Sequence, residues 1–135
     1  MFSIISWILI VVLGATLCVN AGKAIVTNRI KGSGTEPVYV AWGTGAGTTA
    51  ATDTTLFTES AEARTSGTST QQTTTVTNDT YQVIGTITAT ATRAITNAGL
   101  FDASSAGNMF MKGDFSTVNL SSGDAIQFTM KVQFS

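Results

Sequence analysis

The residues that could carry out chemistry in this chain are few and far apart. There is no histidine among the 135 residues, which removes the usual general base, the Ser-His-Asp arrangement and most zinc sites. The eight acidic residues are spread singly, and the closest pair is Glu59 and Glu62. Glycoside hydrolysis needs a facing pair of carboxylates in a cleft, which this spacing does not predict. We therefore expect that the protein is not an enzyme and binds no cofactor.

Three aspartates lie in the C-terminal part of the sequence. Asp102, Asp114 and Asp124 each lie close to Gly or Ser residues, and Asp in such surroundings commonly forms or caps a turn. A calcium site could be assembled from these turns, but the dense acidic spacing of a dedicated calcium loop is absent from the sequence. The pattern predicts turn residues and no metal site.

Two further motifs have a chemical interpretation. The glycine-rich stretch Gly43 to Thr48 could let backbone amides approach a phosphate. Its lysine is missing and its glycine spacing does not fit the dinucleotide fingerprint, so we expect a flexible loop between strands. Cys18 is the single cysteine. It cannot form an intramolecular disulfide, and in an apolar segment its thiol is expected to be inert.

The charge of the chain argues against nucleic acid as a direct partner. The formal net charge is −1, and only 11% of the residues are charged. The seven basic residues form no dense cluster, so they produce no field that would steer a polyanion. The chain also contains 13 glycines, one proline and many threonines. This composition favours extended, turn-rich structure over helices.

The first 22 residues differ from the rest because they carry no charged side chain. Lys23, Arg29 and Lys31 follow this run, which is the wrong polarity for a secretory signal. Two interpretations remain: an apolar arm buried against another subunit, which we favour, and an uncleaved membrane anchor. The candidate partner-contact residues of the arm are Phe2, Ile4, Ile5, Trp7, Ile8, Leu9, Ile10, Val11 and Val12.

Residues 23–135 are predicted to form one domain of all-β class, a β-sandwich. In the last run, Ile126, Phe128, Met130, Val132 and Phe134 occupy one parity, and polar side chains occupy the other. This period of two is typical of a strand with one buried face. Two more strands are expected at 73–77 and 81–92, joined by a turn at Asn78-Asp79.

Other segments give weaker signals. Residues 23–32 fit either a short helix or an irregular strand. Residues 50–72 are predicted to form a long surface excursion with room for one short strand. Within it, Glu59, Glu62 and Arg64 are expected to make a solvated ion cluster that contributes little to stability. Gly99 to Asp102 is expected to form a turn between two strands of the C-terminal unit.

Six segments occur in a characteristic order along the chain: Asn20 to Ile25, Glu36 to Gly45, Ala98 to Asp102, Gly107 to Met111, Phe115 and Ser122 to Asp124. In this order they resemble small structural proteins of tailed bacteriophages, including capsid decoration (cement) proteins. The resemblance covers roughly residues 20–135, and it consists of strand and turn features. It implies a jelly-roll-like β-sandwich on the outer capsid shell, without catalytic chemistry.

The predicted function is therefore a capsid decoration protein that stabilises junctions between subunits of the major capsid protein and also self-associates as a homo-oligomer. The apolar arm would supply the centre of its interface. One alternative is a tail, baseplate or fibre component. A second is a membrane-anchored surface or adhesion module, in which residues 1–19 would span a bilayer.

Overall fold

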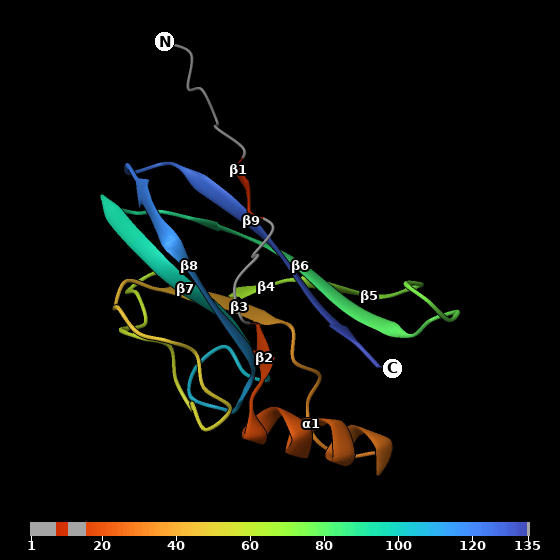
Figure 1. Cartoon of the computed structure of the whole chain (residues 1–135). Coiled ribbons are helices and arrows are strands. Elements are labelled where there is room, and N and C mark those ends of the chain that lie inside the picture. The colour runs from red at the N-terminus through yellow and green to blue at the C-terminus, as the bar shows by residue number, and fades with distance from the viewer. Residues whose placement is uncertain (1–7, 11–15, 135) are drawn as a thin grey trace.

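The computed structural model describes residues 8–10 and 16–134 and shows an all-β sandwich of two sheets, with one helix at one end (Figure 1). The predicted all-β sandwich is confirmed. The chain crosses between the sheets repeatedly, so each sheet combines strands from distant parts of the sequence. No helix within the described ranges is long and apolar enough to cross a membrane.

The first sheet has four strands in the order β1-β9-β6-β5. They are β1 (Ile8–Ile10), β9 (Ala125–Gln133), β6 (Thr80–Thr88) and β5 (Thr68–Gln72). β9 and β6 pair antiparallel over their full length, with Phe128 opposite Gly85. β1 pairs with β9 in parallel, with Ile8 opposite Ile126.

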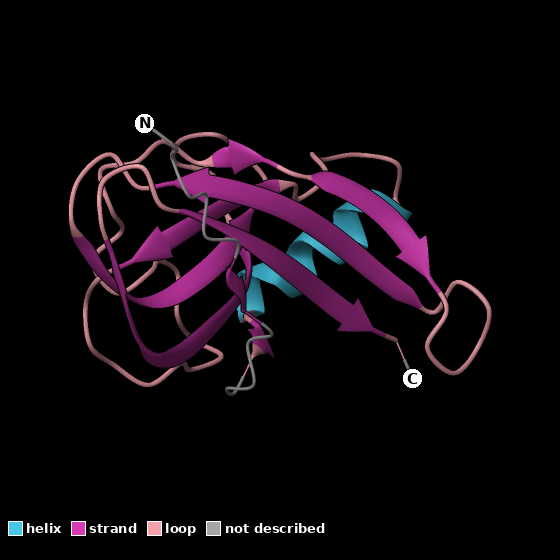
Figure 2. Ribbon diagram, turned by 90° about the horizontal axis from the view of Figure 1, so that it is seen from above, coloured by secondary structure: helices cyan, strands magenta, loops and turns pink. Residues whose placement is uncertain are grey.

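The second sheet has five strands in the order β2-β8-β7-β3-β4. They are β2 (Leu17–Cys18), β8 (Met109–Leu120), β7 (Arg93–Phe101), β3 (Tyr39–Gly43) and β4 (Thr65–Ser66). All four pairings are antiparallel. The two sheets lie face to face, and Figure 2 shows the long strands of both from above.

The core lies between the sheets and confirms the predicted parity from Ile126 to Met130, whereas Phe134, expected on the same buried face, is 54% exposed and lies after the end of β9. Ile126 and Phe128 are fully buried and Met130 is 4% exposed, whereas Lys131 and Gln133 face solvent. The ring of Phe128 packs edge-on against Trp42, with 6.2 Å between the ring centroids. Such aromatic pairs stabilise a core beyond their burial of area alone.

The segment that fitted either helix or strand is a helix, α1 (Asn20–Ile30). It packs on β8, and Gly22 makes this contact possible because a Cβ there would collide with the backbone carbonyl of Phe110. No side chain caps its first turn. After Lys31 the chain turns at Gly32 and Gly34, which both have positive φ, as glycine readily allows.

Three expectations about strand limits are wrong. The strand expected at 81–92 is β6, which ends at Thr88, so residues 89–92 lie outside it. Residues 73–77 lie outside the strands, because β5 ends at Gln72 and the chain then turns around Asp79. The carboxylate of Asp79 accepts hydrogen bonds from the backbone N–H groups of Thr74, Thr75 and Val76. The turn at Asn78-Asp79 is confirmed, with Asn78 at a φ of 61°.

The expected turn at Gly99 to Asp102 also lies elsewhere. Gly99 to Phe101 belong to β7, where they pair with β3 and β8, and the turn begins at Asp102. Apolar neighbours on both sides explain the difference, since Leu100 and Phe101 are fully buried and favour a strand that is covered on both faces.

Candidate interaction groove

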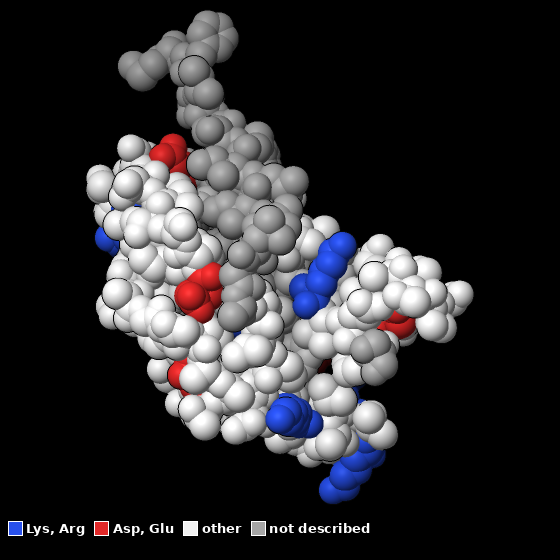
Figure 3. Space-filling model, viewed as in Figure 1, with Lys and Arg blue, Asp and Glu red and all other residues white. Residues whose placement is uncertain are grey.

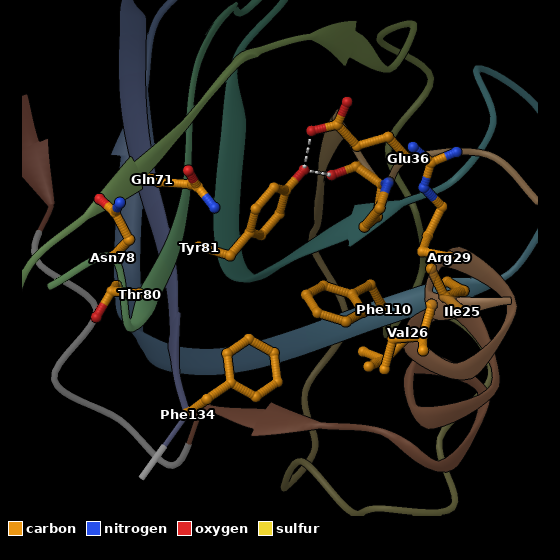
Figure 4. Close-up of a pocket in the computed structure, with 12 residues that line it drawn as sticks. Ile25, Val26, Arg29, Glu36, Gln71, Asn78, Thr80, Tyr81, Phe110 and Phe134 are labelled. Carbon is orange, nitrogen blue, oxygen red and sulfur yellow. Dashed lines mark hydrogen bonds between the residues drawn. The ribbon is translucent and has the colours of Figure 1, made fainter. Parts of the chain in front are cut away.

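A groove of about 420 Å³ lies at one end of the sandwich, between α1 and the four-stranded sheet (Figure 4). Its walls come from α1, from the chain before β3, from β5, β6 and β8, and from the residue after β9. The lining residues are Ile25, Val26, Arg29, Ile30, Glu36, Pro37, Gln71, Asn78, Thr80, Tyr81, Phe110 and Phe134. A mostly apolar concave surface of this kind is typical of a binding site.

Tyr81 is the central polar group of the groove, and its hydroxyl is already engaged. It donates toward the backbone carbonyl of Pro37 at 2.8 Å and lies 3.1 Å from the carboxylate of Glu36. Burial raises the pKa of Tyr81, and the negative charge of Glu36 raises it further. The phenol therefore stays protonated at neutral pH and acts as a structural donor. Its ring packs edge-on against Phe110, 6.1 Å between centroids.

The rim of the groove exposes apolar side chains to solvent. Ile30, at the end of α1, is 82% exposed, and Phe134, directly after β9, is 54% exposed. Ile25 anchors the helix because it is 5% exposed and belongs to the main core. Apolar groups left exposed beside a concave apolar surface are the usual sign of an interaction site.

Arg29 of α1 lines the groove, and the helix that carries it is basic. Lys23, Arg29 and Lys31 lie on or directly after the helix, and its first turn carries no acidic side chain. In Figure 3, Lys and Arg side chains lie over α1 at the lower edge of the view. The guanidinium of Arg29 donates to the backbone carbonyl of Gly34 at 3.1 Å, which helps to hold the turn after the helix.

The structure describes only part of the candidate arm. Ile8, Leu9 and Ile10 form β1, whose backbone pairs with β9 of the same chain. Phe2, Ile4, Ile5, Trp7, Val11 and Val12 lie outside the described residues. The arm does not line the groove within the described part of the chain, since β1 lies beside residues 126–128.

Two of the three C-terminal aspartates are turn residues, as expected. Asp102 accepts a hydrogen bond from the backbone N–H of Asn108 at 2.7 Å, and Asp124 accepts one from Ser121 at 2.7 Å. Asp114 instead lies within β8 and accepts from the backbone N–H of Thr49 at 2.8 Å. Among residues 8–10 and 16–134, no group of three or more His, Cys, Asp or Glu side chains could hold a metal.

Glu62 does not belong to a solvated cluster, which corrects the sequence-based expectation. Its side chain is 3% exposed and pairs with Arg93 at 2.9 Å. It also accepts hydrogen bonds from Ser60, from the indole N–H of Trp42 at 3.2 Å and from the backbone N–H of Thr90 at 3.1 Å. Burial alone would raise the pKa of Glu62, but these bonds outweigh it, and the net pKa lies well below its ordinary range.

Glu59 and Arg64 do form an ion pair near the surface, at 2.7 Å, with Glu59 30% exposed. Arg64 also lies over the ring of Phe101, 3.5 Å from its centroid, and donates to two backbone carbonyls of the turn after β7. The guanidinium therefore links the surface excursion to the β7–β8 turn.

Sequence reasoning missed a buried lysine. Lys112, in β8, has a side chain that is 0% exposed, with Nζ 2.9 Å from Asp53 and 3.1 Å from the carbonyl of Thr55. It also lies over the ring of Phe57 at 3.0 Å. The hydrogen bond from Lys112 is the main cause that lowers the pKa of Asp53, and a hydrogen bond from the backbone N–H of Ala50 lowers it further. The pair fixes the loop over the sheet and leaves no free amine for chemistry.

The glycine-rich loop is held in place, so the expected flexibility is wrong. The N–H of Gly45 donates to the carbonyl of Phe57 at 2.8 Å, and Thr96 donates to the carbonyl of Gly45. The ring of Phe57 lies so close to Gly47 that a side chain there would collide with it.

At Cys18, burial raises the pKa of the thiol, which keeps it protonated at neutral pH.

Comparison with known proteins gives one match. A family described as "Podophage GP4 fiber I protein gp80" matches residues 23–132. No curated protein matches the chain, and no solved structure matches it. The matched range includes α1 from Lys23 onward, all strands from β3 to β8 and nearly all of β9, so it contains most of the groove.

Proposed function

Since this chain belongs to the Podophage GP4 fiber I protein gp80 family, we propose that it is a structural subunit of a bacteriophage tail fibre. The family match carries the proposal, because it covers residues 23–132 and is to a family of phage virion proteins. The all-β sandwich is compatible with this role. Folds of this type serve many functions, so the fold alone would not support it.

The match favours the fibre alternative over the capsid decoration role that the sequence resemblance had suggested. Both roles are those of a virion structural protein, and this coarser description follows from the family itself. The finer difference is the partner. A decoration protein contacts the major capsid protein, whereas a fibre subunit contacts its own copies and the proteins at either end of the fibre.

The proposal includes the expectation that the subunit is not an enzyme. Its support is that the most buried charged groups have structural partners: Glu62 pairs with Arg93, and Lys112 pairs with Asp53. Asp79, Asp102 and Asp124 accept backbone hydrogen bonds in turns. These groups already hold the fold, so they are poor candidates for proton transfer to a substrate.

The test is to locate the protein on the virion. Virions would be labelled with gold-coupled antibodies against the chain and imaged by electron microscopy, and fibres sheared from the particles would be analysed by mass spectrometry. We expect gold along the fibres and enrichment of the chain in the sheared fraction. Gold distributed over the heads, with the chain retained on sheared particles, would instead support capsid decoration and contradict the proposal.

A further inference from the structure

We propose that the groove at α1 receives the apolar N-terminal residues 2–7 of a second copy, so that copies join head to tail. The inference rests on the proposed fibre function and names the partner of the groove as another copy of this chain. Two observations lead to it: the apolar part of the groove matches that segment, and the sheet register places Ile8 far from the groove of its own copy.

The apolar part of the groove matches an apolar occupant, and the charged lining residues Arg29 and Glu36 already have hydrogen-bond partners within the chain. The rings of Tyr81, Phe110 and Phe134 line the groove (Figure 4). Ile30 and Phe134 are exposed lining residues. The hydroxyl of Tyr81 is satisfied by Pro37 and Glu36, so an apolar group could cover the ring without leaving this donor unpaired.

Residues 2–7 have the matching composition. The sequence Phe-Ser-Ile-Ile-Ser-Trp contains no charged side chain and four large apolar ones. Burying it therefore carries no cost of desolvating a charge and removes apolar surface on both partners from water. Aromatic residues such as Phe2 and Trp7 commonly act as the anchors of protein interfaces.

The register of the sheet separates this segment from the groove of its own copy. Ile8 lies opposite Ile126, and the groove lies farther along the same sheet, at Tyr81, which is opposite Val132, and at Phe134. Six to eight residues of strand span about 20–26 Å. The seven residues before Ile8 span at most about 25 Å when fully extended.

The direction of β1 adds to this separation. Because β1 runs parallel to β9, its first residue, Ile8, lies at the end of β1 that is farther from the groove. Contact within one copy would use nearly the full reach of residues 2–7, whereas a second copy can present the segment without this restriction. We therefore assign the groove to the segment of another copy.

The arrangement also predicts the shape of the assembly. β1 lies at one end of the sandwich and α1 at the other (Figure 1). A segment at one end that binds a groove at the opposite end makes a heterologous contact. Such contacts produce open filaments unless the rotation between copies closes a ring. A linear array of this kind is the architecture that a fibre requires.

The first test uses the purified full-length protein in sedimentation velocity. We expect a concentration-dependent series of oligomers. Phe134→Ser removes an apolar rim group and should weaken association about tenfold or more. Val76→Ser is the matched control, because Val76 is 66% exposed and is not among the groove-lining residues. Far-ultraviolet circular dichroism would establish that both variants are folded. Equal association of the two variants would overturn the proposal.

The second test combines two defective variants. Ile5→Lys places a charge in the arm and leaves the groove intact, whereas Phe134→Ser leaves the arm intact. The protein concentration is set so that the natural sequence forms oligomers but a tenfold weaker contact does not. Each variant alone should then be monomeric, and a 1:1 mixture should give dimers and nothing larger, because only one productive arm–groove contact is possible. A mixture that stays monomeric, or that forms long oligomers, would overturn the proposal.

The two proposals fail in different ways. If antibodies label the fibres but the protein shows no arm-dependent association, only the head-to-tail contact is wrong. If the mixture gives dimers but the label lies over the heads, the contact stands as a property of the chain and the fibre function is wrong.

Discussion

Strand β9 and the first part of the excursion, residues 50–64, contact the same residue, Trp42, and are held to the sandwich in opposite ways. On one side, the indole ring of Trp42 packs against Phe128 of β9 in the apolar core. On the other side, its N–H donates to the buried carboxylate of Glu62. The first contact depends on the removal of apolar surface from water, and the second depends on hydrogen bonds to a charge.

The composition of the two regions explains the difference. Every second residue of β9 is apolar from Ile126 to Val132, so the strand can be held by burial alone. The excursion contains Leu56 as its one residue of the buried core and otherwise relies on Glu62 with Arg93 and Asp53 with Lys112. A segment too poor in apolar residues to make a core can still be ordered when a few ionic groups are well satisfied.

The largest expected effect is at the apolar side of this comparison. Phe128→Ala should lower the free energy of unfolding by about 4 kcal/mol, because Phe128 is fully buried and its removal leaves a cavity beside Trp42. Phe134→Ala, at an exposed position next to the same strand, should cost less than about 1 kcal/mol. Urea unfolding followed by tryptophan fluorescence would measure both, and similar losses would contradict the assignment of the core.

The next largest effect should be at Glu62. Glu62→Ala leaves Arg93 and the N–H groups of Trp42 and Thr90 without their acceptor, which should cost about 3 kcal/mol. Glu59→Ala, which breaks the more exposed pair with Arg64, should cost less than about 1 kcal/mol. The same urea experiment distinguishes them. If the two variants were equally stable, the excursion would not depend on its buried carboxylate.

The alternation of β9 was predictable because a strand repeats every two residues, and the buried face holds for Ile126, Phe128 and Met130. It does not extend to Phe134, which lies after the end of the strand and is exposed. The Asn78-Asp79 turn was predictable from residue type, since Asn and Asp both favour turns. These signals are local. The strand limits were predicted wrongly at Leu100 and Phe101. Both residues are buried, so the segment lacks the alternation of apolar and polar residues that indicates a strand, and a turn was expected there instead.

The roles of Glu62, Lys112 and Tyr81 could not be predicted from local patterns. Glu62 meets Arg93 across 31 positions of sequence, and Lys112 meets Asp53 across 59. Nothing in the residues near Glu62 distinguishes it from Glu59, which lies at the surface. The groove likewise depends on residues that are far apart in the sequence, because its walls form where α1 packs beside Tyr81. For the segment that forms α1, the sequence was compatible with either a helix or a strand.

The smallest effect we predict is in the pH dependence of stability. Because the pKa of Glu62 is lower in the folded protein than its ordinary value of 4.5, the unfolded chain takes up this proton first as the pH falls. The contribution of Glu62 is therefore complete at neutral pH and decreases progressively below about pH 5. Glu62→Gln should lose most of this dependence, so its stability deficit relative to the natural sequence should be larger at pH 7 than at pH 3. Glu59→Gln controls for the change in net charge, and urea midpoints at both pH values would measure the difference. A deficit that stays constant between pH 7 and pH 3 would mean that the charge of Glu62 is not what holds the excursion against Trp42.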